Sequence, residues 1–422
     1  MMNNRTPSES AQVLQDGPTA IWVLGILSAL MGFASISTDF YLPALPAMAD
    51  ALHADTGTLE WTVSGYLLGF SFGQLVWGPV GDRYGRRIPV AIGLVLFLIG
   101  SAGCALSGSA DVIIGWRIVQ ALGASAGVVL ARAMVRDLYA GDRAAQMLST
   151  LLTVMAIAPL LGPILGGQIL AISDWRAIFW TLVAVGVLTL AALFLLPETL
   201  PAARRNRQPL MQAFLRYGPL LSNRRLLGYT GAGGLFYGAM FAYIAGSPFA
   251  YITYYHVPPQ LYGLLFAAGI VGIMISNLVN ARLVMRLGGD RLLAAGTSGA
   301  AIAGIALAFQ TWLGWGGLWS LAVLLFLFAS ATGFIVANSI AGAMAGFPDR
   351  AGAVSALVGA LQYGSGILGS ALVGAFADGT PWPMGLVMAL CAIGSFASTQ
   401  LLPRAPSQID LTPFPEATGG IS

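Results

Sequence analysis

A short charged stretch between two apolar runs reads Gly78-Pro79-Val80-Gly81-Asp82-Arg83-Tyr84-Gly85-Arg86-Arg87. Its glycines permit a tight turn and a close approach of neighbouring helices. Its arginines anchor the stretch at one face of a helical bundle, and Asp82 can pair with one of them or cap a helix. Taken by themselves, these residues indicate a structural turn that joins two helices.

The chain on either side of this turn has the composition of a membrane protein. Of its 422 residues, 57% are hydrophobic and 9% are charged, whereas soluble proteins carry about 25% charged residues. All 20 basic residues are arginine, and no basic patch interleaved with aromatic residues suits nucleic acid. Cys104 and Cys391 lie inside apolar runs and lack metal-ligand spacing. We therefore expect a lipid bilayer as partner, and neither nucleic acid nor a metal ion.

Twelve apolar runs are long enough to cross a membrane, since a spanning helix needs about 20 predominantly apolar residues. They predict an all-α membrane protein with twelve transmembrane helices. The first run is too long for the core of a signal peptide, so we expect it to be retained. The runs cover residues 19–43, 58–80, 88–107, 111–136, 144–171, 176–196, 227–251, 260–285, 292–312, 317–344, 351–376 and 382–402.

One long polar link, residues 197–226, divides the runs into two groups of six and carries six arginines. It separates an N-terminal half at 19–196 from a C-terminal half at 227–402. Polar tails at 1–18 and 403–422 complete the predicted organisation.

Two short segments recur at the same spacing in the two halves. Ile164-Leu165-Gly166 returns as Ile367-Leu368-Gly369, and Arg83-Tyr84-Gly85 returns as Arg286-Leu287-Gly288. Because both copies occupy equivalent topological places, they indicate two duplicated, pseudo-symmetric halves related about an axis along the membrane normal. The alternative is that glycine-rich membrane helices resemble one another.

The distribution of arginine predicts the orientation, because cytoplasmic loops carry an excess of basic residues. With the N-terminus in the cytoplasm, all arginines except Arg117 and Arg176 fall at cytoplasmic ends or in cytoplasmic loops. We expect both termini to be cytoplasmic, in the inner membrane of a bacterium.

The stretch 78–87 resembles the signature between the second and third helices of the major facilitator superfamily, Gly-x-x-x-Asp-Arg-x-Gly-Arg-Arg. The resemblance implies a twelve-helix transporter in which this loop helps to latch the cytoplasmic side. The copy after the eighth run departs from the signature, with Met285 at the place of Asp82. The implied latch residues are Gly78, Asp82, Arg83, Gly85, Arg86 and Arg87.

The fifth run contains Ala158-Pro159-Leu160-Leu161-Gly162-Pro163-Ile164-Leu165-Gly166-Gly167. Prolines remove helix hydrogen bonds and glycines admit a neighbouring helix, so one interpretation is a kinked packing face. The segment also resembles the helix 5 signature of antiporters in the same superfamily, which implies export rather than uptake. The residues that carry this resemblance are Pro159, Gly162, Pro163, Gly166 and Gly167.

The first run ends in Ser37-Thr38-Asp39-Phe40-Tyr41-Leu42-Pro43-Ala44-Leu45-Pro46, where Asp39 follows some twenty mostly apolar residues. An ionisable group in a membrane helix costs at least about 2.5–3.5 kcal/mol, so it marks a functional or a paired structural site. The segment resembles helix 1 of the bicyclomycin- and chloramphenicol-resistance exporters (the Bcr/CflA group), as do Trp175-Arg176, Pro197-Glu198-Thr199 and Ser247-Pro248-Phe249. This resemblance implies a drug:proton antiporter in which Asp39 exchanges a proton.

Arg117 is the only basic residue well inside a predicted helix and must face protein or water. Its surroundings are similar to the Arg-x-x-Gln-Gly signature of the superfamily, with a departure at Ala121. Pairing with Asp39 would make Arg117 either a static anchor of the outer bundle or a group that responds to the proton on Asp39. Both interpretations stay open.

Aromatic residues crowd the run 227–251, where Tyr237 and Phe241 share a helix face. Apolar and aromatic walls suit a drug-sized ligand, although such side chains can equally face lipid. Asn338 and Gln362 are further candidates for the wall of the cavity. No catalytic set or metal-ligand cluster accompanies them, so we expect no enzyme and no cofactor other than the proton as coupling ion.

Together these patterns predict proton-coupled efflux of small amphipathic drugs, such as phenicols or bicyclomycin-like compounds, by alternating access. We expect a functional monomer. The alternatives are an exporter of sugars or other endogenous metabolites and, from a different class, a non-transporting membrane receptor.

Overall fold

All regular secondary structure in the described part of the chain is helical. The computed structural model describes residues 21–139, 141–205, 223–345, 347 and 351–402. The N-terminal group comprises α2 (Ile21–Asp39), α3 (Leu45–Leu52), α4 (Thr56–Tyr84), α5 (Arg87–Leu106), α6 (Ala110–Leu138), α7 (Gly141–Ile172) and α8 (Trp175–Leu193). The C-terminal group comprises α10 (Arg224–Pro248), α11 (Pro259–Leu287), α12 (Gly289–Leu313), α13 (Gly317–Ser330), α14 (Thr332–Ala345), α15 (Ala351–Ala375) and α16 (Trp382–Thr399). Three short helical turns are the 3-10 helices η1 (Leu42–Ala44) and η2 (Ala202–Arg204) and the π-helix η4 (Phe249–Tyr254).

The twelve predicted transmembrane helices are confirmed. Ten stretches of the described chain are long and apolar enough to cross a membrane, and one of them combines α13 with α14. The two remaining spans are α4, with 29 residues, and α7, with 32 residues. Both exceed the length of about 20 residues that a spanning helix needs.

The first span differs from the predicted continuous helix over 19–43. Its helix α2 ends at Asp39, and the chain bends before it continues as η1 and α3. Proline contributes to the break, because the ring of a proline clashes with the carbonyl four residues earlier and its nitrogen donates no hydrogen bond. Pro43 is four residues after Asp39, so it removes a hydrogen bond and disfavours an α-helix there, although α7 continues through Pro159 and Pro163. Asp39 therefore lies at an interior helix end, and the span continues to Leu52.

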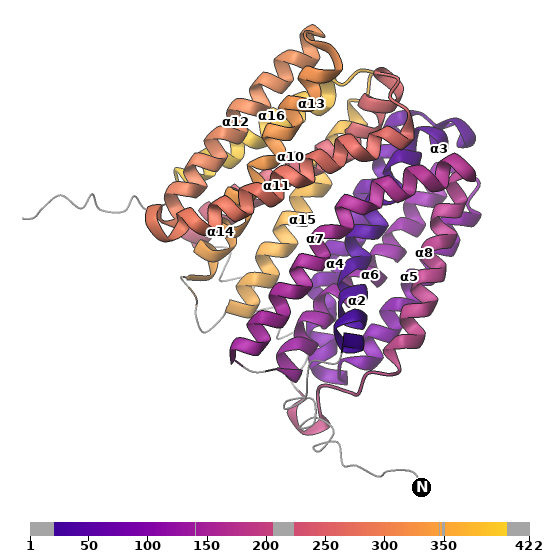
Figure 1. Ribbon diagram of the computed structural model, residues 1–422, viewed down its shortest axis with the longest axis vertical. Coiled ribbons are helices and arrows are strands. Elements are labelled where there is room, and N and C mark those ends of the chain that lie inside the picture. The colour runs from indigo at the N-terminus through magenta and orange to yellow at the C-terminus, as the bar shows by residue number, and fades with distance from the viewer. Residues whose placement is uncertain (1–20, 140, 206–222, 346, 348–350, 403–422) are drawn as a thin grey trace, which may run out of the picture.

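The two helix groups lie side by side, with the indigo-to-magenta helices on one side and the orange-to-yellow helices on the other (Figure 1). Between the groups, α4 packs on α15 and α7 packs on α11. A hydrogen bond of 2.8 Å joins the hydroxyls of Ser64 and Ser370, and Ser71 Oγ donates to the Ala360 carbonyl at 3.1 Å. Small side chains thus let the groups approach closely along α4 and α15.

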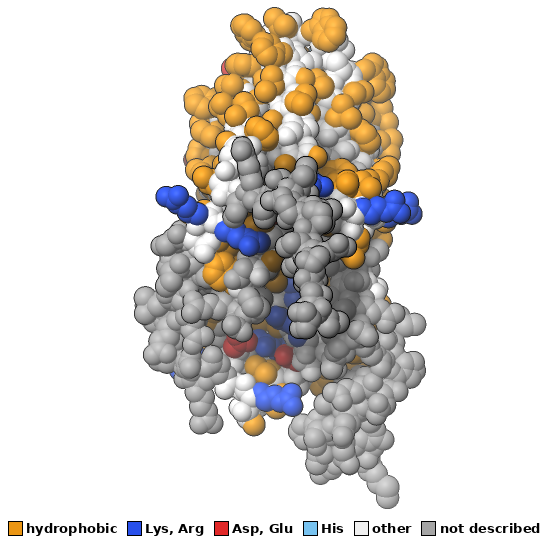
Figure 2. Space-filling model, turned by 90° about the vertical axis from the view of Figure 1, so that its left-hand side faces the viewer, with side chains coloured by type: hydrophobic (Ala, Val, Ile, Leu, Met, Phe, Trp, Pro, Cys, Tyr) orange, Lys and Arg blue, Asp and Glu red, His pale blue; other side chains and the backbone are white. Residues whose placement is uncertain are grey.

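The helices alternate in direction, which defines two ends of the bundle. The Asp55 end contains the turn before α4 and the turn after α15, whereas the arginine-rich end contains the turn between α4 and α5. Large apolar side chains are exposed between these ends, among them Ile302 at 70% and Trp319 at 73%. Figure 2 shows such side chains covering the upper part of one face, above a band of basic side chains. This surface suits contact with lipid.

Candidate functional site

A cavity of about 220 Å³ lies between the two helix groups. The N-terminal group contributes residues from α2, α4 and α7, and the C-terminal group contributes residues from α10, α11, α13, α14 and α15. Most of the wall is apolar or aromatic. Asp39 is the one carboxylate among the described residues that line it.

Asp39 is held in the cavity wall by the end of α2 and by glycines of α7. Its side chain is only 5% exposed. A Cβ atom at Gly162 would lie 3.0 Å from the Cβ of Asp39, and a Cβ at Gly166 would collide with the carbonyl oxygen of Phe40. The segment expected from the antiporter signature therefore packs directly on the residues that position Asp39. Pro159 of the same helix lines the cavity beside it.

Arg117 is fully buried on α6 and contacts the end of α2. Its Nη1 donates to the Ser37 carbonyl at 2.9 Å and also to Gln120 Oε1. Its guanidinium carbon lies 4.1 Å from the ring centroid of Tyr41 and 4.3 Å from that of Tyr66. Cation–π contact stabilises a buried guanidinium, and here Nε and Nη2 make no hydrogen bond to a described residue.

No salt bridge within 4.0 Å joins Asp39 to Arg117 in the part of the chain that the structure describes. Arg117 instead donates to a backbone carbonyl in the last turn of α2, that of Ser37, two residues before Asp39. Gln120 extends this contact to α5, because its Nε2 donates to Ser101 Oγ at 2.8 Å. The arginine thus acts on the helix end that carries the carboxylate.

The predicted cavity residues Tyr237 and Phe241 both line the cavity. They pack on Tyr363 of α15, with centroid distances of 5.9 and 5.8 Å, and Tyr363 packs on Phe70 of α4 at 4.7 Å. This aromatic cluster, Phe70, Tyr237, Phe241 and Tyr363, connects the two helix groups. Sequence reasoning missed Tyr363, although it directly follows Gln362 and is the one tyrosine in the run 351–376.

Asn338 and Gln362 do not line this cavity. Asn338 Nδ2 donates to Asn280 Oδ1 at 2.7 Å and joins α14 to α11. Gln362 is 4% exposed, and its Nε2 lies 3.2 Å from the place of a Cβ at Gly233. Both side chains are therefore buried within the C-terminal group rather than facing the space between the groups.

The predicted latch forms a polar cluster at the arginine-rich end. Arg86, whose side chain is 8% exposed, pairs with Asp82 at 2.6 Å and with Asp137 of α6 at 2.9 Å. Glu198 accepts hydrogen bonds from the backbone nitrogens of Arg86 at 2.8 Å and Arg87 at 3.2 Å. Sequence reasoning missed Asp137, which directly follows the predicted run 111–136 and lies in the last turn of α6.

The other predicted latch residues surround this cluster. Gly85 has a φ of +95°, a conformation that favours glycine. Arg83 is exposed and lies over the ring of Tyr84, and Gly78 packs loosely, 4.0 Å from Val129. Among the described residues, the hydrogen bonds of Arg86 and Arg87 stay within the first 200 residues. The described cluster therefore ties α4 and α5 to α6 and to the segment after α8.

At the Asp55 end, the two helix groups make close backbone contacts through α7 and α11. A Cβ atom at Gly263 of α11 would lie 2.8 Å from the Cα of Ile164, and one at Gly167 would lie 2.8 Å from the Pro259 carbonyl oxygen. The start of α11 therefore packs directly on the end of α7. Gly167, one of the residues that carry the resemblance to the antiporter signature, is part of this contact.

The chain is similar to known membrane transporters over most of its length. The family model of the Major Facilitator Superfamily matches residues 26–370. The chain is 35% identical to the uncharacterized MFS-type transporter YdgK of Bacillus subtilis (strain 168), over 89% of this chain and 93% of that protein. It is 31% identical to the bicyclomycin resistance protein homolog of Haemophilus influenzae, over 88% and 93%. It is also 32% identical to the chloramphenicol resistance protein of Pseudomonas aeruginosa, over 85% of each.

The fold has close counterparts among solved structures. A mutant of the nucleoside transporter NupG matches with a TM-score of 0.72, over 90% of this chain and 99% of that one. The two sequences are 16% identical, so this likeness bears on the fold alone.

Proposed function

Because this chain belongs to the major facilitator superfamily and is a transporter rather than an enzyme, we propose that it exports small amphipathic drugs in exchange for protons. The observation that carries the proposal is the buried carboxylate of Asp39 in the wall of a cavity between two helix groups. A carboxyl group in such a place is neutral when it is protonated and negatively charged when it is not. Burial of the charged form without a partner costs free energy, so the group readily binds a proton.

The proposed cycle follows from the position of this carboxylate. When the cavity faces outside, Asp39 takes up a proton. When the cavity faces inside, Asp39 releases the proton and a drug takes its place. One charge that crosses about 100 mV yields about 2.3 kcal/mol. About 1.4 kcal/mol corresponds to a tenfold change in an equilibrium constant. One proton therefore supports a ratio of outside to inside drug concentration of a few tens to one.

The aromatic cluster supports a drug-sized, largely apolar substrate. Ligand pockets of about 300–1,000 Å³ are typically lined by apolar and aromatic side chains with a few polar groups. The cavity of about 220 Å³ is smaller than this range, so drug binding requires the helix groups to separate. Relatives named for bicyclomycin and chloramphenicol resistance support uncharged antibiotics of that size as substrates.

The proposed setting is the cytoplasmic membrane of a bacterium, with the arginine-rich end and both termini inside. The excess of arginine at one end of the bundle supports this orientation. In this orientation the Asp55 end, where α7 and α11 make close backbone contacts, faces outside, and Gly162 and Gly166 pack on Asp39 and Phe40. We propose that the protein works as a monomer, because each chain contains a complete cavity between its own helix groups.

The test measures both drug resistance and proton movement. Cells that express the chain are grown with chloramphenicol or bicyclomycin, and inverted membrane vesicles report proton release when drug is added. Asp39→Asn should abolish both responses at normal membrane abundance. Asp50→Asn, which changes an exposed acid of α3, is the matched control and should retain both. Uphill, proton-dependent export by Asp39→Asn would disprove the role of Asp39.

A further inference from the structure

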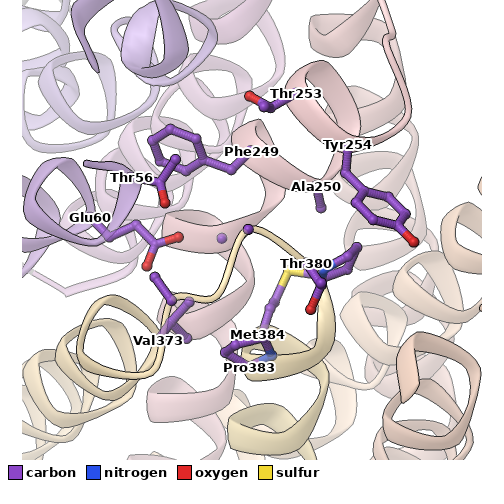
Figure 3. A pocket seen from close by; sticks show the side chains of 14 residues that line it. Thr56, Glu60, Phe249, Ala250, Thr253, Tyr254, Val373, Thr380, Pro383 and Met384 are labelled. Atoms are coloured by element: carbon purple, nitrogen blue, oxygen red, sulfur yellow. The ribbon is translucent and has the colours of Figure 1, made fainter. Parts of the chain in front are cut away.

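A second buried carboxylate, Glu60 of α4, lies near the Asp55 end. Its side chain is 4% exposed, and its Oε2 makes no hydrogen bond to a described residue. It faces a small cavity of about 30 Å³ that is separate from the cavity at Asp39. Figure 3 shows the Glu60 carboxylate pointing from α4 into this space, with Thr56 above it and Val373 below.

The wall around Glu60 belongs almost entirely to the opposite helix group. Only Thr56 and Glu60 come from the N-terminal group, whereas the other lining residues come from α10, η4, α15, α16 and the turn between α15 and α16. Glu60 is thus enclosed by the contact between the two groups. Separation of the groups at this end would bring its carboxylate into water.

The helix contacts next to Glu60 are close on both sides. One turn earlier, Gly57 packs on the carbonyl oxygen of Gly374, and one turn later the hydroxyls of Ser64 and Ser370 are 2.8 Å apart. Because helix residues three and four apart share a face, Glu60 lies in the middle of this row. Its burial therefore depends on the contact between α4 and α15.

No positive charge compensates Glu60 within the described wall. The titratable groups that face it are Tyr254, which lines the cavity, and Asp55, which caps the start of α4. Asp378 lies in the turn after α15, and its Oδ1 accepts hydrogen bonds from the backbone and side chain of Thr380. All three groups are acids or phenols, so none neutralises a carboxylate.

From this geometry we infer that Glu60 is a second proton-binding site, occupied when the helix groups are closed at the Asp55 end and emptied to outside water when they separate. A buried carboxylate without a partner is neutralised by a proton rather than kept charged. The closed form therefore binds one more proton than the open form. Protons outside then favour closure, which is the step that follows proton uptake in the proposed exchange cycle.

This inference rests on the proposed alternation between two forms, but its test needs no drug and no transport. Spin labels at Ala51→Cys and Trp315→Cys report the distance between the groups at the Asp55 end, in a chain with Cys104→Ala and Cys391→Ala. Both labelled positions are exposed. Asp39→Asn is added so that the first proton site does not contribute. The protein is placed in lipid nanodiscs, and the two populations are measured between about pH 5 and pH 9, a range that spans the titration of perturbed carboxyls.

With Glu60 present, the closed population should fall as the pH rises. One linked proton changes the ratio of closed to open forms by at most about tenfold per pH unit. Glu60→Gln has the shape of the protonated acid and no proton to lose, so it should remain closed at every pH. Asp50→Asn, an exposed acid at the same end, should keep the full pH response.

Several outcomes would overturn the inference. An unchanged pH response in Glu60→Gln, or no response in either protein, excludes a linked proton at Glu60. The buffer cation can also be changed from choline to sodium at constant pH. If sodium increases the closed population in the protein with Glu60 but not in Glu60→Gln, the ligand is a metal cation instead of a proton. Size-exclusion profiles of Glu60→Gln and Glu60→Asp show whether each variant is folded. If Asp39→Asn retains drug export while Glu60→Gln loses the pH response, the proposed role of Asp39 fails and this inference stands.

Discussion

Gly166 of α7 lies against the carbonyl oxygen of Phe40, so closely that no other residue fits at this position without movement of the backbone. Phe40 directly follows Asp39, the end of α2. The glycine of one predicted motif thus fixes the place of the acid in another. This relationship joins two parts of the chain that the sequence presents as separate signatures.

Gly166→Ala should therefore impair export and stability together. The added methyl group forces α7 away from the bend after Asp39, and overpacking of this kind costs about 1–3 kcal/mol. Resistance in growing cells and thermal unfolding in detergent measure the two effects. Gly115→Ala on α6 is the matched control, since a Cβ atom there would meet nothing within 4 Å. Equal behaviour of the two variants would show that the contact with Phe40 is unimportant.

Arg117→Lys should abolish proton-coupled export although it keeps the positive charge. The planar guanidinium lies between the rings of Tyr41 and Tyr66 while it donates to the Ser37 carbonyl. A lysine ammonium cannot make the same stacked and hydrogen-bonded arrangement. Drug-driven proton release from inverted vesicles measures the loss. Arg291→Lys, at an exposed position, should behave as the unmodified protein, and full activity of Arg117→Lys would mean that charge alone suffices.

Asp137→Ala should destabilise the protein more than Asp82→Ala, although both acids pair with Arg86. The side chain of Asp137 is 18% exposed and that of Asp82 is 52% exposed. Exposed ion pairs contribute about 0.2–1 kcal/mol, whereas loss of a partner from a buried charged group costs about 1–3 kcal/mol or more. Thermal unfolding of the purified variants in detergent makes the comparison. The reverse order would place the main anchor of Arg86 at Asp82.

Tyr363→Ala should change which drugs are exported, because it opens the centre of the aromatic cluster. Its ring contacts Tyr237, Phe241 and Phe70, from both helix groups. Tyr363→Phe keeps the ring and should preserve the substrate profile. A resistance panel of phenicols, bicyclomycin and cationic dyes measures the change. Phe309→Ala removes an exposed ring of α12 and is the matched control; an identical profile for Tyr363→Ala would exclude the cluster from substrate binding.

The helices could be predicted from the sequence because lipid imposes one strong rule on composition. A run of about 20 apolar residues has to form a helix when it crosses a bilayer. The bend after Asp39 could not be predicted from hydropathy, because the apolar character of the chain continues through η1 and α3. Pro43 lies four residues after Asp39, but it could not predict this break by itself, because α4 and α7 continue through their own prolines.

The cavity could be predicted only in part, because hydropathy does not say which face of a helix points inward. Tyr237 and Phe241 were proposed for the cavity wall from their shared helix face, and both line the cavity between the groups. Asn338 was expected there on polarity alone, yet it pairs with Asn280 inside the C-terminal group. Its partner lies 58 residues away in the chain, and only the packing of α14 on α11 brings the two amides together.

The interior end of α2 has an electrostatic consequence for the first span. A helix carries about half a negative elementary charge at its C-terminus, and here that end, at Ser37 and Asp39, lies beside Arg117. The backbone dipole and two aromatic rings thus serve as the counter-ion of the guanidinium. Neither the helix end nor the two rings carries a group that has to lose a proton to stabilise Arg117. In the proposed cycle, proton exchange at Asp39 would therefore leave these partners of Arg117 in place.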